Sequence, residues 1–133
     1  MPTAITRMNP TTLPDAGKVG YSQISIADPD RLAFVSGQVA WHRESGAVPG
    51  SLAEQTALVV ENLKGALDAL QATPNDIVQM RIYLTDLRPQ TQDIAMPKIL
   101  QFLDGAKPSL TGLGVAALAA PELELEMVVQ VPV

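Results

Sequence analysis

The apolar residues follow two different periods along this chain, and the order of these segments is the strongest constraint on its fold. Alternation with polar or small residues predicts a half-buried β-strand, whereas recurrence at steps of three and four predicts an amphipathic helix. The predicted elements are strands at 21–27, 32–39, 77–86, 110–118 and 123–131 and helices at 51–71 and 93–103. This order, β-β-α-β-α-β-β, is typical of an α+β protein.

Local signals refine these predictions. Ser51 and Glu54 form a capping box, in which each side chain bonds a backbone amide at the start of the first helix. Polar residues, including Gln55, fall largely off the apolar stripe of this helix. The first two strands are predicted to pair as a hairpin, because the sequence at 28–31 favours a turn. Gly37, inside the second of them, indicates a close approach of the backbone.

The whole chain, residues 1–133, is predicted to form one two-layer α+β domain with two helices on one face of the sheet. Residues 1–20 are expected to be an irregular arm with one short edge strand around Ala4 and Ile5. The second face of the sheet combines apolar, glycine, arginine and glutamate residues, and Gly112 and Gly114 leave part of it bare. We expect this face to meet another copy of the chain.

The composition excludes several kinds of functional site. The chain has no Cys and 1 His, so disulfides, thiol nucleophiles and multi-histidine metal sites are excluded. A net charge of −5 argues against nucleic acid and acidic membranes as partners. The chain also has no apolar run of signal-peptide or membrane-spanning length. A soluble, cytoplasmic protein without a metal is therefore expected.

Five short motifs identify a family resemblance. They are Gly20-Tyr21-Ser22-Gln23, Phe34-Val35-Ser36-Gly37-Gln38, Glu61-Asn62-Leu63-Lys64, Tyr83-Leu84-Thr85-Asp86-Leu87 and Glu124-Leu125-Glu126. In order and spacing they resemble the reactive intermediate deaminase family, RidA or YjgF, whose members are also called L-PSP endoribonucleases. The resemblance implies a chorismate-mutase-like α+β fold with a mixed sheet. It also implies homotrimers with a central barrel of sheets and small-molecule clefts between subunits.

The resemblance further implies a reaction and candidate site residues. Active members hydrolyse imines and enamines to 2-oxo acids and ammonia without a cofactor. Glu124 matches the glutamate that positions water, Tyr21 the aromatic residue of the cleft, and Gly37 the glycine whose backbone lines the pocket. Ser36, beside Gly37, is a further candidate for substrate binding. For each of these residues a purely structural role stays open.

Leu110 departs from the family pattern. The family places an arginine in a Pro-x-Arg-[Ser/Thr] motif, where its guanidinium grips the substrate carboxylate. Here the matching residues are Lys107-Pro108-Ser109-Leu110-Thr111, so a leucine occupies the arginine position. An apolar side chain disfavours a carboxylate, so the standard 2-imino acid is not the expected substrate.

Three explanations of Leu110 stay open: the ligand lacks a carboxylate at that point, another cation replaces the arginine, or catalysis has been lost. Arg81 is the candidate replacement, because the alternation puts it on the same face as Glu124 and Glu126. The alternative for Arg81 is an ion pair with one of these glutamates inside the oligomer.

The favoured function is a homotrimer that binds, or acts on, imine- or enamine-type or related metabolites. The alternative is an active deaminase of altered substrate range. Ribonuclease activity or translation inhibition is the least favoured, because the sequence pI is about 4.6. Trp41-His42-Arg43 is interpreted as a solvated loop, the alternative being that it overhangs the cleft and sets ligand choice. The sequence leaves the physiological ligand and the pathway open.

Overall fold

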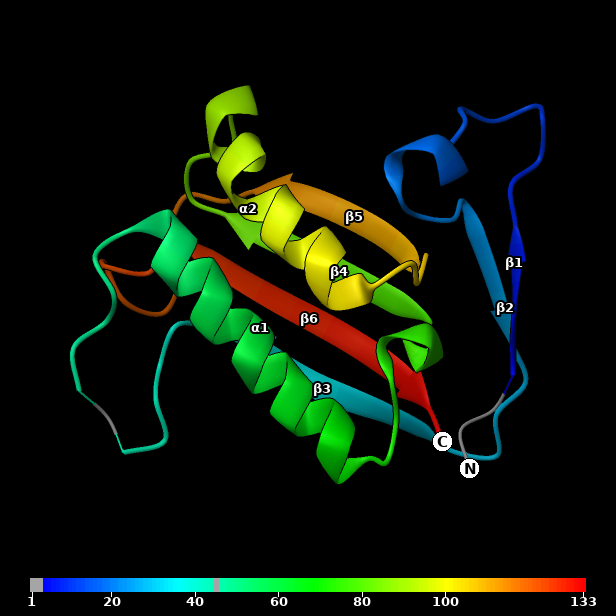
Figure 1. Cartoon of the computed structure of the whole chain (residues 1–133), viewed down its shortest axis with the longest axis horizontal. Coiled ribbons are helices and arrows are strands. Elements are labelled where there is room, and N and C mark those ends of the chain that lie inside the picture. Colours follow the sequence, from blue (N-terminus) through cyan, green and yellow to red (C-terminus); the bar gives the residue numbers. More distant parts are fainter. Residues whose placement is uncertain (1–3, 45) are drawn as a thin grey trace.

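Two helices pack on one face of a four-stranded sheet (Figure 1). A computed structural model describes residues 4–44 and 46–133. In chain order the elements are β1 (Ile5–Met8), η1 (Gly17–Val19), β2 (Ile24–Ala27), β3 (Leu32–Gln38), α1 (Leu52–Ala69), η2 (Pro74–Asp76), β4 (Gln79–Leu84), α2 (Pro89–Leu103), β5 (Ser109–Gly114) and β6 (Leu125–Pro132). The sheet order is β3-β6-β4-β5, with β4 and β5 parallel and the other pairs antiparallel. The predicted α+β class with a mixed sheet is confirmed.

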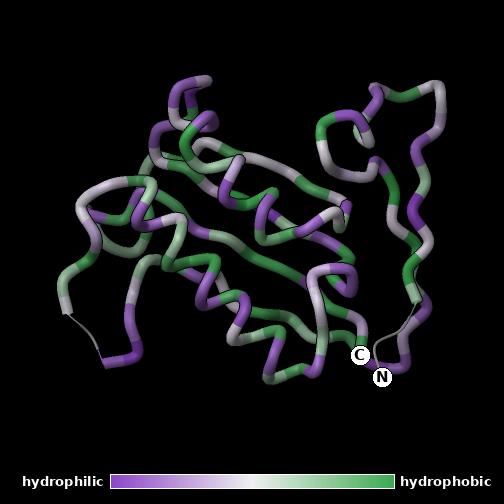
Figure 2. Tube along the Cα trace, viewed as in Figure 1, coloured by the Kyte–Doolittle hydropathy of each residue, from purple (hydrophilic) through white to green (hydrophobic). Residues whose placement is uncertain are grey.

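The hydrophobic core lies between the helices and the sheet. The alternation along β4 buries Met80, Ile82 and Leu84 on the helix side, as the sequence predicted. β6 also buries alternate residues against the helices, and much of its length is apolar (Figure 2). The helix at 51–71 is confirmed as α1, and the side chain of its N-cap Ser51 accepts a hydrogen bond from the Glu54 amide.

The predicted hairpin of the first two strands is wrong. β2 pairs with β1, with Thr6 opposite Ile26, and the two form a separate ribbon, whereas β3 pairs with β6. Arg7 links this ribbon to the main body, because its guanidinium donates to the Ser25 hydroxyl at 2.9 Å and to the Ile77 carbonyl at 2.9 Å. The turn at 28–31 thus joins two strands that do not pair with each other, because β2 forms its hydrogen bonds with β1 instead.

The arm at residues 1–20 is more ordered than predicted in its described part. It contains η1 and a strand that runs from Ile5 to Met8, and residues 1–3 lie outside the described residues. Buried Ser22 fixes the end of the arm beside β5, since its amide donates to the Pro108 carbonyl at 3.1 Å and its hydroxyl to the Lys107 carbonyl at 2.6 Å. These bonds position Tyr21 next to the sheet.

The second helix begins earlier than predicted. α2 starts at Pro89 rather than Asp93, because proline suits the first helical position and the Thr91 hydroxyl accepts from the Arg88 amide at 3.0 Å. Pro97 lies inside the helix, which still continues to Leu103. Asp104 ends it in the left-handed region, at φ 46°.

The register of β5 corrects the sequence-based assignment of its glycines. Gly112 lies opposite Ile82 and Gly114 opposite Leu84, so both glycines face the helix side. Leu113 lies opposite Tyr83, on the open face of the sheet. Alternation alone separates the two faces of a strand, whereas only its pairing register says which face is covered. The bare strip therefore lies beneath α2.

The open face carries exposed apolar side chains. Phe34 is 71% exposed, and it lies opposite Gln130 in β6. Arg81 and Tyr83 share this face, with Glu126 opposite Tyr83. This mixture of apolar, arginine and glutamate residues is the one that the sequence predicted for the face away from the helices.

Candidate functional site

A cleft of about 420 Å³ opens between α2, β5 and the end of the arm. The residues that line it are Val19, Gly20, Tyr21, Ile82, Leu84, Leu87, Gln92, Met96, Leu100, Leu110 and Gly112. None of these lining residues is charged, and Tyr21 and Gln92 are the two with polar side chains. The cleft is therefore an apolar cavity with two groups able to form directed hydrogen bonds.

Two glycines shape the cleft. A Cβ atom built on Gly112 would meet no atom within 4 Å, so the missing side chain leaves open space above β5. Gly20 has a φ of 102°, and a Cβ there would lie 2.8 Å from Leu100 Cδ2. Glycine at position 20 thus lets the arm turn tightly and close against α2.

Tyr21 and Leu110, two of the predicted site residues, meet in this cleft. Leu110 lies opposite Met80 in the parallel pair of β4 and β5, and this register turns its half-buried side chain toward the helix side. The position expected to hold an arginine is thus part of an apolar wall. The polar Gln92 of α2 is a lining residue that the sequence reasoning missed, since nothing local distinguishes it from a solvated helix residue.

Ser36 and Gly37 lie at the opposite edge of the sheet. β3 and β5 are the two edge strands, and three strand spacings separate them by about 14 Å. The close approach predicted at Gly37 is confirmed: a Cβ there would lie 2.5 Å from the side chain of Glu126. The pairing register shifts between Val35 and Gln38, which brings this part of β3 against β6.

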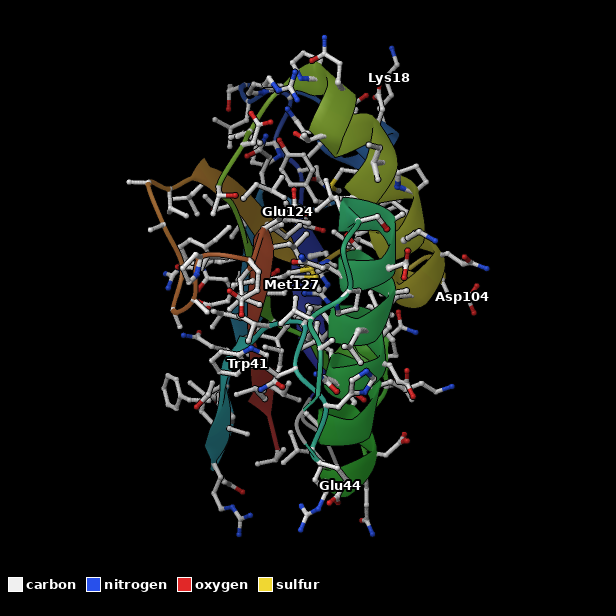
Figure 3. The ribbon with its side chains drawn as sticks, turned by 90° about the vertical axis from the view of Figure 1, so that its left-hand side faces the viewer. Lys18, Trp41, Glu44, Asp104, Glu124 and Met127 are labelled. Atoms are coloured by element: carbon white, nitrogen blue, oxygen red, sulfur yellow. The ribbon has the colours of Figure 1, made fainter. Side chains whose placement is uncertain are left out.

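Glu124 lies just before β6, beside the first turn of α1 (Figure 3). Its backbone is held on both sides, since its amide donates to Gln55 Oε1 at 2.9 Å and its carbonyl accepts from the Thr85 amide at 3.1 Å. The side chain is half-buried. Glu124 does not line the cleft, but Thr85 directly follows Leu84, which does.

Arg81 lies on the open face of the sheet. It is exposed and stands opposite Thr111 and Val128, whereas the cleft lies on the helix side. Within one chain, Arg81 is therefore not placed to replace the missing arginine. In the described part of the chain it also forms no salt bridge with Glu124 or Glu126. An ion pair across subunits stays a prediction.

Gln55 is a second residue that the sequence reasoning missed. The helical stripe placed it away from the core, yet it is only 1% exposed. Its side-chain amide contacts the Pro49 carbonyl, the Glu122 carbonyl and Glu124. Its position in the first turn of a helix that covers the end of a sheet was the one hint of burial in the sequence. The hydrogen-bond partners Glu122 and Glu124 are too far away in sequence to be recognised.

The remaining candidate residues lie outside this cleft. Trp41, His42 and Arg43 are exposed, and none of them lines the cleft. In residues 4–44 and 46–133, no cluster of three or more histidine or carboxylate side chains is arranged to hold a metal ion. Over the same residues, no helix is both long and apolar enough to span a membrane.

Comparisons with known proteins identify relatives of this chain. A family model described as endoribonuclease L-PSP matches residues 14–133. The RutC family protein YjgH of Escherichia coli is 34% identical over 101 residues, which are 76% of each chain. TdcF of Escherichia coli, whose name marks it as an inferred reactive intermediate deaminase, is 32% identical over 56 residues, covering 42% of this chain and 43% of TdcF.

A solved structure extends the likeness to the fold. YyfB of Yersinia pestis, described as a Rid-family protein of unknown function, superimposes with a TM-score of 0.89 at 33% identity. The superposition covers 97% of this chain and 98% of YyfB. Together with the motifs and the sheet order, these matches show that the chain belongs to the RidA/YjgF family of L-PSP-type proteins.

Proposed function

We propose that this protein is a RidA/YjgF-family homotrimer whose clefts bind uncharged imine- or enamine-type or related metabolites rather than 2-imino acids. The observation that carries this proposal is Leu110 in a cleft whose lining residues are all uncharged. A carboxylate that entered it would lose hydrating water and gain no cation in exchange, which costs several kcal/mol or more. Standard deamination of 2-imino acids is disfavoured for this reason.

The lining residues indicate what the ligand looks like. A volume of about 420 Å³ is in the range of small-molecule sites. The Tyr21 hydroxyl and the Gln92 amide each can donate and accept a hydrogen bond, while the leucine and methionine side chains suit an apolar body. The expected ligand is therefore a neutral compound with an apolar portion and one or two polar groups.

The separation of the candidate residues supports an assembled site. Ser36 and Gly37 lie about 14 Å from β5, so one ligand cannot contact them and Leu110 in the same chain. A second copy packed along the β5 edge would bring the residues of its own β3 edge to the cleft, and exposed Phe34 on β3 offers apolar surface for a contact between copies. Light scattering tests this assembly. We expect three times the chain mass of 14.1 kDa, and a monomer would contradict it.

Active deamination of altered substrate range is the second candidate function. Its support is Glu124, a half-buried carboxylate with a fixed backbone, which is suited to position a water molecule. It predicts ammonia release from imines or enamines that lack a carboxylate. Ribonuclease activity has less support, because a net charge of −5 repels phosphates.

A matched pair of ligands tests the proposal. Calorimetric titration with a short 2-oxo acid and with its neutral primary amide should show tighter binding of the amide by the wild type. Leu110→Arg should reverse this preference by about 10- to 100-fold, since a hydrogen bond to a charged group contributes about 1.5–3 kcal/mol. Gln101→Arg is the control, because it adds the same charge at an exposed position of α2 that does not line the cleft. Equal or tighter binding of the acid by the wild type would contradict the proposal.

A further inference from the structure

Gln55 is a buried amide that joins α1 to the start of β6. It lies in the first turn of α1 and is 1% exposed. Its Nε2 donates to the Glu122 carbonyl at 2.8 Å and to the Pro49 carbonyl at 3.0 Å. Its Oε1 accepts from the Glu124 amide at 2.9 Å. One side chain therefore satisfies three backbone groups that come from two separate loops.

Only one orientation of this amide is chemically consistent. The two carbonyls can only accept, so they require the NH₂ end, and the Glu124 amide can only donate, so it requires the oxygen end. The NH₂ group also approaches Glu124 Oε2 at 3.5 Å, a distance at which a hydrogen bond is weak. The main action of Gln55 on Glu124 is thus on its backbone.

We propose that Gln55 is the positioning residue for Glu124 and aims its carboxylate. Glu124 precedes β6, so the ladder of β6 does not hold its amide, and Gln55 supplies the missing acceptor. The Thr85 amide fixes the other side of the same residue through the Glu124 carbonyl at 3.1 Å. With both backbone groups held, the direction of the Cα–Cβ bond of Glu124 is preset before any ligand arrives, and the Gln55 NH₂ group at 3.5 Å from Oε2 favours one orientation of the carboxylate. The proposal rests on the role of Glu124 in the second candidate function, active deamination.

NMR spectroscopy of Gln55→Met tests the proposal without a ligand, because methionine keeps the volume and removes the amide. We expect amide hydrogen exchange of Glu124 to speed up about tenfold or more, since its hydrogen bond is lost. The Glu124 carboxyl ¹³C signal should also shift, while that of Glu126, two residues along the strand, stays in place. Unchanged Glu124 signals, or equal shifts of both glutamates, would overturn the proposal.

Asn62→Leu is the matched control. Asn62 is also an amide on α1 that donates to backbone carbonyls, those of Val39 and Trp41, but it does not touch Glu124. It should lower the melting temperature and leave both Glu124 signals unchanged. If Gln55→Met does not fold, the wild type decides: the Gln55 NH₂ protons should exchange much more slowly than those of exposed Gln101, and equal rates would contradict the proposal.

A double-mutant cycle adds the functional readout. If Gln55 acts through Glu124, the variant with both Gln55→Met and Glu124→Gln should release ammonia no more slowly than Glu124→Gln alone. A further loss in the double variant would show a structural role that is independent of Glu124, against the proposal. If the wild type itself has no activity on any imine, the deaminase alternative fails, and the NMR measurements still decide the role of Gln55.

Discussion

Charged side chains are distributed unequally between the β5 edge of the sheet and the half formed by β3 and β6. At the β5 edge, the cleft is lined by uncharged residues, and Leu110 occupies the position where the family resemblance predicts an arginine. In the other half, Glu124 lies just before the central strand β6 and Glu126 lies within it, one held by Gln55 and the other packed over Gly37. The uncharged cleft thus lies at one edge, whereas the carboxylates lie on a central strand.

This difference indicates which part of the family site has changed. The end with the carboxylates keeps both glutamates and the glycine that makes room for Glu126, whereas the cleft has an apolar residue at the position of the carboxylate-binding arginine. If Glu124 acts as proposed, a change of ligand requires new cleft residues only, because Glu124 lies outside the cleft, just before β6.

The largest effect is expected from a charge on the open face. Phe34→Glu should convert the proposed trimer into monomers and abolish ligand binding that depends on two copies, because a carboxylate cannot be buried without a partner. Light scattering and calorimetry measure the two effects. Ile94→Glu is the control, since Ile94 is an exposed apolar residue of α2, 44% accessible, that lies off this face. If Phe34→Glu is still a trimer, the open face is not the contact surface between copies.

Filling the cleft should have the next largest effect. Gly112→Leu places a side chain into the open space above β5, and we expect at least about tenfold weaker binding of the neutral amide ligand. The melting temperature should change little, because a Cβ at this position meets no atom within 4 Å. Unchanged affinity in calorimetry would place the ligand elsewhere.

The smallest effect is expected at Gly37. Gly37→Ala should lower the free energy of unfolding by about 1–3 kcal/mol, because the new methyl group collides with the Glu126 side chain, which must move. Chemical denaturation measures this change. Gly65→Ala on α1 has open space and should instead stabilise the protein by about 0.5–1 kcal/mol. A neutral Gly37→Ala would show that Glu126 moves aside without cost.

The sequence predicted the elements of the fold better than their pairing. The two periods located both helices and the core-facing residues of β4 and β6, and the glycine inside β3 indicated its close approach to another residue. The hairpin was wrong because β1 competes for the edge of β2. Gln55 was misplaced because a polar residue is buried only when distant backbone groups satisfy it.

Local chemistry by itself determined the element types, the family motifs and the absence of an arginine at position 110, because each depends on residue identity and spacing. The tertiary structure alone decided which face of β5 carries the glycines, and hence that the bare strip opens into a cleft with Leu110 and Tyr21. It also decided that Arg81 faces away from that cleft. Both depend on register, which is fixed by contacts between strands far apart in the chain rather than by neighbours in sequence.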